Sequence, residues 1–350
     1  MRGIAALLVV YFHFDLHIVH RYPDFPIPPG SFTDYFVLGY FDLGKFAVGV
    51  FFLVSGFLIP TTLTSPGATL RRYAIHRFFR LYPAYWLSLL AFVATQWTFD
   101  RGALIDWNNV VVNLTMLQKF VGVPDAVGTY WTLQIELIFY AVCALLFIAG
   151  RLQRREMVIA AALLGGLVCA LIRYRTGKSL PVALFIAVAL MFVGDGLRAL
   201  AERRTSVKRV TVLVAAVAAA LIPIALLAYR HEGVRYVLTY WVALGTFIGA
   251  FAVRVQIEGA VRANRIGRLL ADYSYSVYLL HGSVGAVLSS TVFAATGSIT
   301  WAALTMLGST YLLAYAAYLC IERPCIRLGR CIADRSRIES LRLLFTNRVI

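Results

Sequence analysis

The sequence predicts an all-α integral membrane protein of about ten transmembrane helices, with both termini in the cytoplasm. Of its 350 residues, 60% are hydrophobic and only 14% are charged, and the mean hydropathy is +0.76. A soluble domain of this length does not need so large an apolar fraction to fill its core. We therefore expect lipid, rather than water, to cover much of the surface.

Ten apolar runs with few charges come close to the length of about 20 residues that a helix needs to cross the hydrocarbon core of a membrane. The first run lacks a small-residue cleavage site, so we expect a first span there and not a signal peptide. The ten expected spans are residues 3–20, 43–63, 82–99, 131–150, 156–174, 179–197, 210–229, 236–253, 273–296 and 299–321.

The stretch at 108–123, NNVVVNLTMLQKFVGV, is short and interrupted by polar side chains, which favours a re-entrant or interfacial segment. If this stretch does not cross the membrane and lies on its outer side, 24 of the 33 lysines and arginines fall on the cytoplasmic side. That asymmetry follows the positive-inside rule, whereas an additional crossing here would invert every later loop and scatter the basic residues. Basic loops facing anionic lipid also account for the net charge of +16, so no nucleic-acid partner is expected.

The chain shows no internal repeat or low-complexity linker, which predicts one transmembrane domain at 1–321 and a basic cytoplasmic tail at 322–350. The tail is expected to be either amphipathic or disordered. Five cysteines without C-x-x-C spacing, in a reducing compartment, predict neither disulfides nor zinc thiolates. Neither a Walker-type loop nor a G-x-S-x-G elbow is present, so ATP-driven transport and α/β-hydrolase chemistry lack their usual signatures.

Polar residues in the first span are the first functional candidates, because ionisable groups inside a membrane are energetically unfavourable. Arg2 and His13 lie eleven residues apart, which places them on one helical face with a rise of about 16 Å between them. His17 and His20 follow on the same face, with Asp15 nearby. Three interpretations stay open: His13 is a general base, it is hydrogen-bonded at a helix interface, or three histidines form a metal site.

An arginine pair marks the cytoplasmic mouth of the third span. Arg77 and Arg80 are three residues apart in the run RRYAIHRFFRLYPAYW at 71–86, so they share a helical face. Two guanidinium groups in this arrangement suit a phosphorylated cytoplasmic ligand. The alternative is a positive-inside anchor of the span.

Glu136 is the most unusual residue in the sequence, because it is an ionisable side chain within an otherwise apolar span. It lies about one and a half turns into the span at 131–150, which sinks its carboxylate below the outer interface. Such a carboxylate needs a partner, and we expect a histidine or arginine from another helix. Trp131, at the entrance of this span, either belongs to the interfacial aromatic belt or stacks against a sugar.

A second histidine lies in DYSYSVYLLHG at 272–282. His281 is expected near mid-depth of the span at 273–296, with Ser274 and Tyr278 on the same face. It is either a second catalytic or positioning histidine or the donor of a helix–helix hydrogen bond.

Six short stretches give a more specific indication, because they occur in order along essentially the whole chain. The series resembles the acyltransferase 3 family of integral membrane acyltransferases. The resemblance implies transfer of an acyl group, usually acetyl, from cytoplasmic acyl-CoA to a hydroxyl group. The six stretches are RGIAALLVVYFHF at 2–14, GVFFLVSGFLI at 49–59, HRFFRLYPAYW at 76–86, WTLQIELIFY at 131–140, SYSVYLLH at 274–281 and IERP at 321–324.

The same resemblance implies a place in the bacterial cytoplasmic (inner) membrane and no permanently bound cofactor. Acceptors in the family are sugars of lipopolysaccharide O-antigen, exopolysaccharide, glucans or Nod factors, and macrolide antibiotics for some members. Some members also carry a periplasmic SGNH-type domain, which we do not expect in this chain. A transporter or flippase for a lipid-linked sugar is the alternative from another class, but the sequence shows no internal symmetry to favour it.

Family signatures fall on four residues of this chain. The Arg-x10-His signature falls on Arg2 and His13, and the Arg-x-x-Arg signature falls on Arg77 and Arg80. In the family a short stretch, often ending Leu-Asp-Gly, precedes the first arginine, whereas Met1 directly precedes it here. Either the natural start lies upstream, or the first helix is anchored less firmly.

These observations predict a membrane O-acyltransferase that acts on a carbohydrate or lipid-linked sugar, with His13 as the general base and acyl-CoA as the donor. Direct transfer and an acyl-histidine intermediate both stay open. No metal is assigned. The catalytic residues are predicted to be His13 and Glu136, the acyl-CoA-binding residues Arg2, Arg77 and Arg80, and the residues that bind or position the acceptor Trp131, His281, Ser55 and Tyr278.

Overall fold

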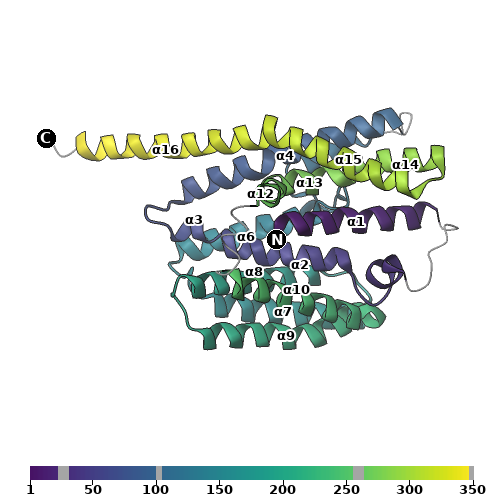
Figure 1. Ribbon diagram of the computed structural model, residues 1–350. Coiled ribbons are helices and arrows are strands. Elements are labelled where there is room, and N and C mark those ends of the chain that lie inside the picture. The colour runs from purple at the N-terminus through teal and green to yellow at the C-terminus, as the bar shows by residue number, and fades with distance from the viewer. Residues whose placement is uncertain (23–30, 100–104, 255–263, 347–350) are drawn as a thin grey trace. The chain divides into compact units, whose positions relative to one another are not determined.

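The computed structural model describes residues 1–22, 31–99, 105–254 and 264–346, and all regular structure within these ranges is helical (Figure 1). The chain divides into two compact units. The first unit comprises Met1–Thr61 and Trp131–Asp272, and the second comprises Thr62–Tyr130 and Tyr273–Ile350. Each unit therefore combines two segments that are distant in the sequence.

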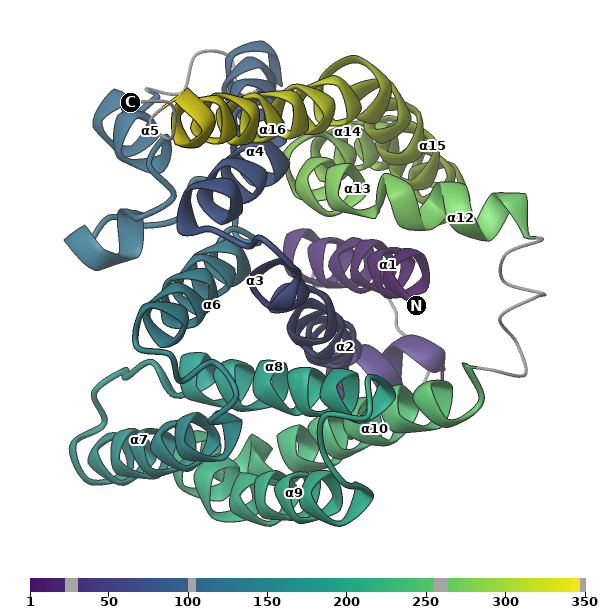
Figure 2. The ribbon, with the colours of Figure 1, turned by 90° about the vertical axis from the view of Figure 1, so that its left-hand side faces the viewer.

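In the first unit, α8 is the central helix. It lies between α2 on one side and α7 and α9 on the other (Figure 2), and most of its residues are buried. The helices of this unit are α1 (Arg2–Arg21), η1 (Asp34–Leu38), α2 (Leu43–Leu58), α6 (Trp131–Ile148), α7 (Arg155–Thr176), α8 (Val182–Ala201), α9 (Val207–Tyr229), η3 (Arg230–Glu232), α10 (Gly233–Ala252) and α12 (Arg265–Asp272).

Two glycines set the close approach of α2 and α8. A Cβ atom at Gly56 would overlap the carbonyl oxygen of Met191, and one at Gly194 would overlap that of Leu53. Small residues at such crossings let helix backbones come into direct contact, which is how helices associate where lipid provides no hydrophobic driving force.

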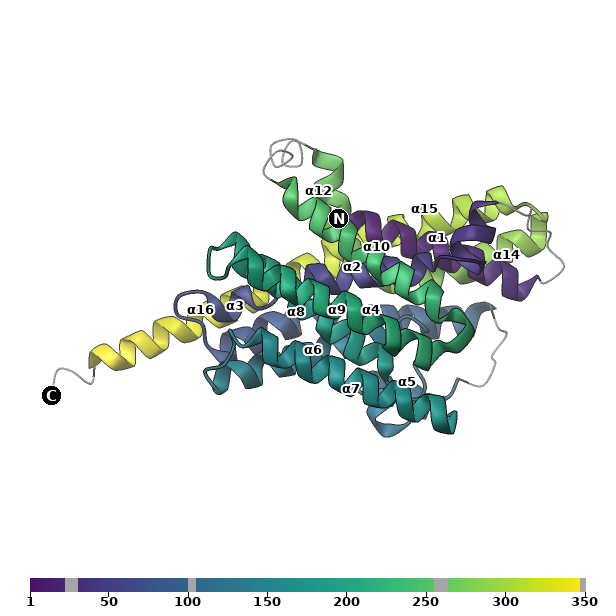
Figure 3. The same cartoon turned by 90° about the horizontal axis from the view of Figure 1, so that it is seen from below.

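The second unit is built on α4, a helix of 30 residues that includes Pro83. Helix α16 packs along α4, and α14 runs beside α15 (Figure 3). The helices of this unit are α3 (Thr61–Thr64), which begins at the boundary, α4 (Leu70–Phe99), α5 (Trp107–Asn113), η2 (Gln118–Val121), α13 (Ser274–Leu280), η4 (His281–Gly285), α14 (Ala286–Thr296), α15 (Ile299–Ala317), η5 (Tyr318–Glu322) and α16 (Arg323–Thr346).

Helix boundaries follow the local chemistry of the sequence. The side chains of Ser206 and Ser298 accept hydrogen bonds from backbone N–H groups in the first turns of α9 and α15, as N-cap residues do. Gly177 and Gly297 end α7 and α14 with φ of +71° and +64°, a left-handed conformation that glycine adopts without a steric penalty.

Among the described residues, eight helical stretches are long and apolar enough to cross a membrane. One of them, Val207–Ala252, contains the two spans expected at 210–229 and 236–253, which form α9 and α10 on either side of η3. The first expected span is helical as α1 but is not one of the eight. The chain is thus a multi-pass membrane protein, whereas ten crossings with cytoplasmic termini stay a prediction.

The stretch at 108–123 forms the short helices α5 and η2, with 7 and 4 residues, which are too short to span a bilayer. Aromatic side chains of α4 hold this stretch in place by donating to backbone carbonyls. The hydroxyl of Tyr85 donates to the carbonyl of Asn113 at 2.6 Å, and the indole of Trp86 donates to that of Leu114 at 3.0 Å. The tail after residue 322 continues as α16.

The close approach of α2 and α8 predicts that Gly56→Ala destabilises the protein. The added methyl group would force the two backbones apart, at about 1–3 kcal/mol for overpacking of this kind. Thermal unfolding of the purified protein in detergent measures the effect. Gly245→Ala on α10 is the matched control, because a Cβ atom there meets nothing within 4 Å. Equal melting temperatures for the two variants would contradict the prediction.

Candidate active site

His13 lies half-buried on α1, with its ring edge-on to Phe12 at a centroid distance of 5.3 Å. Its Nδ1 atom is 2.9 Å from the carbonyl oxygen of Val9. Because a carbonyl can only accept a hydrogen bond, Nδ1 carries the proton, and the neutral imidazole has its lone pair on Nε2. This is the tautomer in which Nε2 can act as a base.

The metal site considered for the three histidines of α1 includes His20 and so stays a prediction. Arg2 and His17 are half-buried, and the side chain of His20 lies outside the described residues. Within the described residues, no group of three or more His, Cys, Asp or Glu side chains is arranged to hold a metal ion.

A buried carboxylate stands near His13 at the start of α2. The ring of Phe12, the residue before His13, packs against the backbone of Gly44, two residues after Asp42. Asp42 caps α2 by accepting a hydrogen bond from the backbone N–H of Lys45 at 2.7 Å. Its own N–H donates to Thr239 at 3.1 Å. Sequence reasoning missed Asp42, although an acidic residue directly before a span is a typical N-cap signal.

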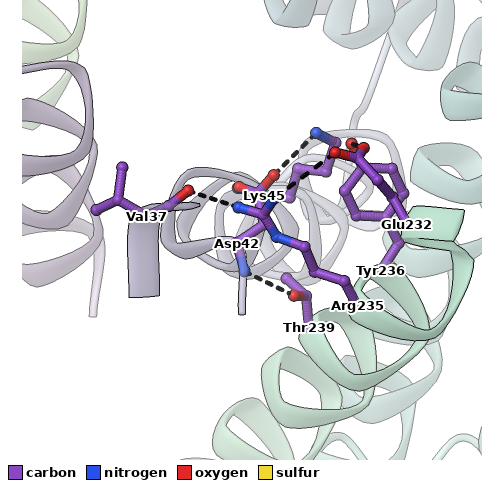
Figure 4. A network of polar contacts seen from close by, with 7 residues as sticks. All are labelled: Val37, Asp42, Lys45, Glu232, Arg235, Tyr236 and Thr239. Atoms are coloured by element: carbon purple, nitrogen blue, oxygen red, sulfur yellow. Dashed lines mark hydrogen bonds and ion pairs between the residues drawn. The ribbon is translucent and has the colours of Figure 1, made fainter. Parts of the chain in front are cut away.

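The charge of Asp42 is balanced within a wider network (Figure 4). The ammonium group of Lys45 lies 3.0 Å from the Asp42 carboxylate and 4.1 Å from the centroid of the Tyr236 ring. The hydroxyl of Tyr236 donates to Glu232 at 2.5 Å, and the guanidinium of Arg235 lies 3.7 Å from the same carboxylate. The network thus joins two carboxylates and two cations at one end of α2 and α10.

Glu136 has a partner different from the expected one. The hydroxyl of Tyr140, one turn further along α6, donates to its carboxylate at 2.5 Å. We had expected a histidine or arginine from another helix. Trp131 is the first residue of α6 and is half-exposed, and Ser55 is buried on α2 beside Gly56.

In the second unit, His281 is completely buried and begins the π-helical turn η4. Its Nδ1 atom lies 3.3 Å from the carbonyl oxygen of Val277, and its ring lies 5.7 Å from that of Tyr278. The hydroxyl of Tyr278 donates to the carbonyl of Thr129 at 3.1 Å. π-Helical turns are rare and occur frequently at functional sites.

Hydroxyl groups of α4 connect this helix to α13 and η4. Ser88 donates to the carbonyl of Leu279 at 3.0 Å, and Thr95 donates to that of Ser283 at 3.0 Å. The hydroxyls of Ser88 and Tyr130 also lie 2.8 Å apart. These hydrogen bonds fix the helix segment that carries His281 against α4.

The two arginines of the Arg-x-x-Arg signature have different partners. Arg77 donates to the hydroxyl of Thr62 at 3.1 Å. Arg80 forms an ion pair with Glu322, which is fully buried. In the sequence Glu322 stands out only as part of the stretch IERP at 321–324, which does not by itself indicate a role.

The predicted site residues thus fall into two sets. The first unit contains His13, Arg2, Glu136, Trp131 and Ser55, and the second contains Arg77, Arg80, Tyr278 and His281. That the two sets act together in one active site is a prediction.

Comparison with known proteins decides the class of the chain. The sequence profile of a family described as an acyltransferase domain matches residues 1–319. The chain belongs to the acyltransferase 3 family. This acyltransferase is also similar to the exopolysaccharide production protein ExoZ of Rhizobium meliloti (strain 1021). The two are 28% identical over 296 residues, which cover 80% of this chain and 88% of that protein. No solved structure matches the chain.

The two functions of Asp42 in this acyltransferase, helix cap and counter-ion, predict different effects for two substitutions. Asp42→Asn keeps a capping oxygen and removes only the charge, whereas Asp42→Ala removes both. We therefore expect the alanine variant to be less stable than the asparagine variant by about 1 kcal/mol, the typical value of an N-cap. Thermal unfolding in detergent compares the two, and an alanine variant as stable as the asparagine variant would exclude the cap.

Proposed function

We propose that this acyltransferase moves an acyl group, acetyl in the simplest case, from cytoplasmic acyl-CoA to a sugar hydroxyl of an exopolysaccharide, a surface polysaccharide or a glycolipid. The family supports acyl transfer, and the similarity to ExoZ supports a carbohydrate acceptor. The proposed location is the bacterial inner membrane. The observation that carries the chemistry is the Nδ1 hydrogen bond of His13, which directs the lone pair to Nε2.

In the proposed reaction, Nε2 of His13 takes the proton from the acceptor hydroxyl as its oxygen attacks the thioester carbonyl carbon. The new C–O bond forms, the C–S bond breaks, and the CoA thiolate recovers the proton from the imidazolium. The carbonyl of Val9 holds Nδ1–H throughout. General-base assistance of this kind contributes about 10²–10⁴ to a rate.

The donor is assigned to the arginines at the cytoplasmic ends of α4 and α1. Arg77 and Arg80 are proposed to bind phosphates of acyl-CoA, together with Arg2. Guanidinium groups are suited to this because they donate to phosphate oxygens in a bidentate geometry. No permanently bound cofactor is needed for the reaction.

The acceptor is assigned to residues with a polar tip or an aromatic face. One oxygen of Glu136 accepts from Tyr140, and we assign the other to a hydroxyl of the sugar. Trp131 is proposed to stack on a sugar face, as aromatic rings with one exposed side do. Ser55, Tyr278 and His281 complete the residues that are proposed to position the acceptor.

His13→Asn provides the sharpest test of the base. The asparagine amide can still donate to the carbonyl of Val9, but it has no atom in place of Nε2. We expect acetyl transfer from labelled acetyl-CoA to fall by at least about 10²-fold, while the amount of folded protein is unchanged. His231→Asn, at an exposed position in η3, is the control and should retain activity. Transfer by the His13 variant at the wild-type rate would rule out the base.

Arg77→Ala tests the donor assignment. Losing a charge-assisted hydrogen bond to a phosphate typically weakens binding by about 1.5–3 kcal/mol, so the KM for acetyl-CoA should rise about tenfold or more while kcat changes little. Arg72→Ala removes the same charge from the same helix end, where Arg72 lies 3.6 Å from Asp334, and should leave the KM unchanged. If both variants keep the wild-type KM, Arg77 only anchors the span.

A further inference from the structure

Glu322 is a buried carboxylate that connects three helical segments of the second unit. It is the last residue of η5 and is 1% exposed. One carboxylate oxygen pairs with the guanidinium of Arg80 on α4. The other accepts a hydrogen bond from the hydroxyl of Ser276 on α13 at 2.6 Å. A carboxylate that is buried in the protein to this extent is stable only because both of its oxygens have partners.

The local sequence explains how Glu322 reaches Arg80. η5 is a π-helical turn over Tyr318–Glu322, and such a turn inserts one additional residue into a helix and so redirects the side chains that follow. Pro324 comes two residues later and has no N–H group to donate to the preceding turn. A wider turn is expected where a helical hydrogen bond is missing.

The packing of α16 on α4 keeps this geometry fixed. A Cβ atom at Gly329 would lie 2.7 Å from the Cβ of Phe79, so glycine allows the two helices to approach closely at a point next to Arg80. A turn of α4 and a turn of α16 are therefore held together close to the Arg80–Glu322 ion pair. The Glu322 carboxylate consequently has little freedom to move away from the guanidinium.

A third contact orients the guanidinium itself. The centre of the Arg80 guanidinium lies 5.5 Å from the centroid of the Tyr275 ring, within the range of a cation–π contact. The hydroxyl of Tyr275 in turn donates to the carbonyl of Leu81 at 3.0 Å, which fixes the ring. The Arg80 side chain is 25% exposed, whereas that of Glu322 is 0% exposed. The arginine thus extends from a rigid, buried attachment towards the surface.

We propose that Glu322 is a positioning residue for acyl-CoA binding: it holds Arg80 in the orientation that receives a phosphate group, and Ser276 holds Glu322. The proposal rests on the proposed function, in which Arg80 binds the donor. A guanidinium has five N–H donors in a fixed plane, so one carboxylate can orient it while it donates to a phosphate. Arg77, by comparison, donates to the hydroxyl of Thr62.

The test uses the full-length protein, purified in detergent, with labelled acetyl-CoA as the donor. Glu322→Gln keeps an acceptor for Ser276 and removes the charge that orients Arg80. We expect its KM for acetyl-CoA to rise about tenfold, the effect of about 1.4 kcal/mol, with kcat within about a factor of two. Ser276→Ala leaves the charge in place and should raise the KM in the same direction by a smaller factor.

Asp125→Asn is the matched control within the same unit. Asp125 also accepts from one cation and one neutral donor, Lys119 at 3.0 Å and Gln118 at 2.8 Å. If loss of any such carboxylate disturbs the unit in general, this variant will raise the KM as well, and the positioning role is overturned. An unchanged KM for the control and a raised KM for Glu322→Gln support it.

A double-mutant cycle then separates positioning from an independent effect. If Glu322 acts through Arg80, the variant that combines Arg80→Ala with Glu322→Gln will have the same KM as Arg80→Ala alone. If the double variant instead shows the product of the two single-variant increases in KM, the proposal is overturned. A Glu322→Gln variant with an unchanged KM and a lowered melting temperature would also overturn it, because that result assigns Glu322 a purely structural role.

Failure of the positioning role is distinguishable from failure of the proposed function. Wild-type protein that neither binds nor consumes acetyl-CoA would overturn both together. Wild-type protein that consumes acetyl-CoA, combined with a wild-type KM for Glu322→Gln, would overturn only the role of Glu322.

Discussion

The absence of water in the hydrocarbon core is the constraint on which the rest of this structure depends. A polar group there must find its hydrogen-bond partner within the protein, because none is available from the surroundings. In this structure His13 donates to a carbonyl of its own helix, and Glu136 accepts from a tyrosine one turn away. The hydrogen bond to Val9 fixes the tautomer of His13, and the hydrogen bond from Tyr140 orients the Glu136 carboxylate.

This constraint also explains how each unit holds together. Where apolar side chains gain nothing by leaving lipid for protein, helices associate through close packing and interhelical hydrogen bonds. The first unit uses glycines, so that Gly56 brings α2 against α8. The second unit uses hydroxyls, so that Ser88 and Thr95 on α4 bond to carbonyls of α13 and η4. Helices pack closely in both cases, and Ser55 of the first unit and the four candidate residues of the second unit lie on or next to these packed helices.

Much of the helical architecture could be predicted from length and hydropathy, because a spanning helix needs only a run of apolar residues. The stretch at 108–123 was correctly expected not to form a spanning helix. The partner of Glu136 was within reach as well, since Tyr140 lies at the i+4 position. The division into two units was not predictable, because each unit combines two segments that are separated along the chain. Glu322 was missed for a related reason: its partner Arg80 is 242 residues away, and no local pattern reports a contact over that distance.

The alternation of the two units has a consequence for how the protein is made. Synthesis delivers the first segment of one unit, then the first segment of the other, and only afterwards the segments that complete them. The hydroxyls of Ser88 and Thr95 on α4 therefore lack their final partners until α13 and η4 have been made. Non-local contacts of this kind form slowly, because a long loop has to close before they stabilise anything. During biogenesis of this acyltransferase, α4 therefore remains without these packing partners while most of the chain is still being translated.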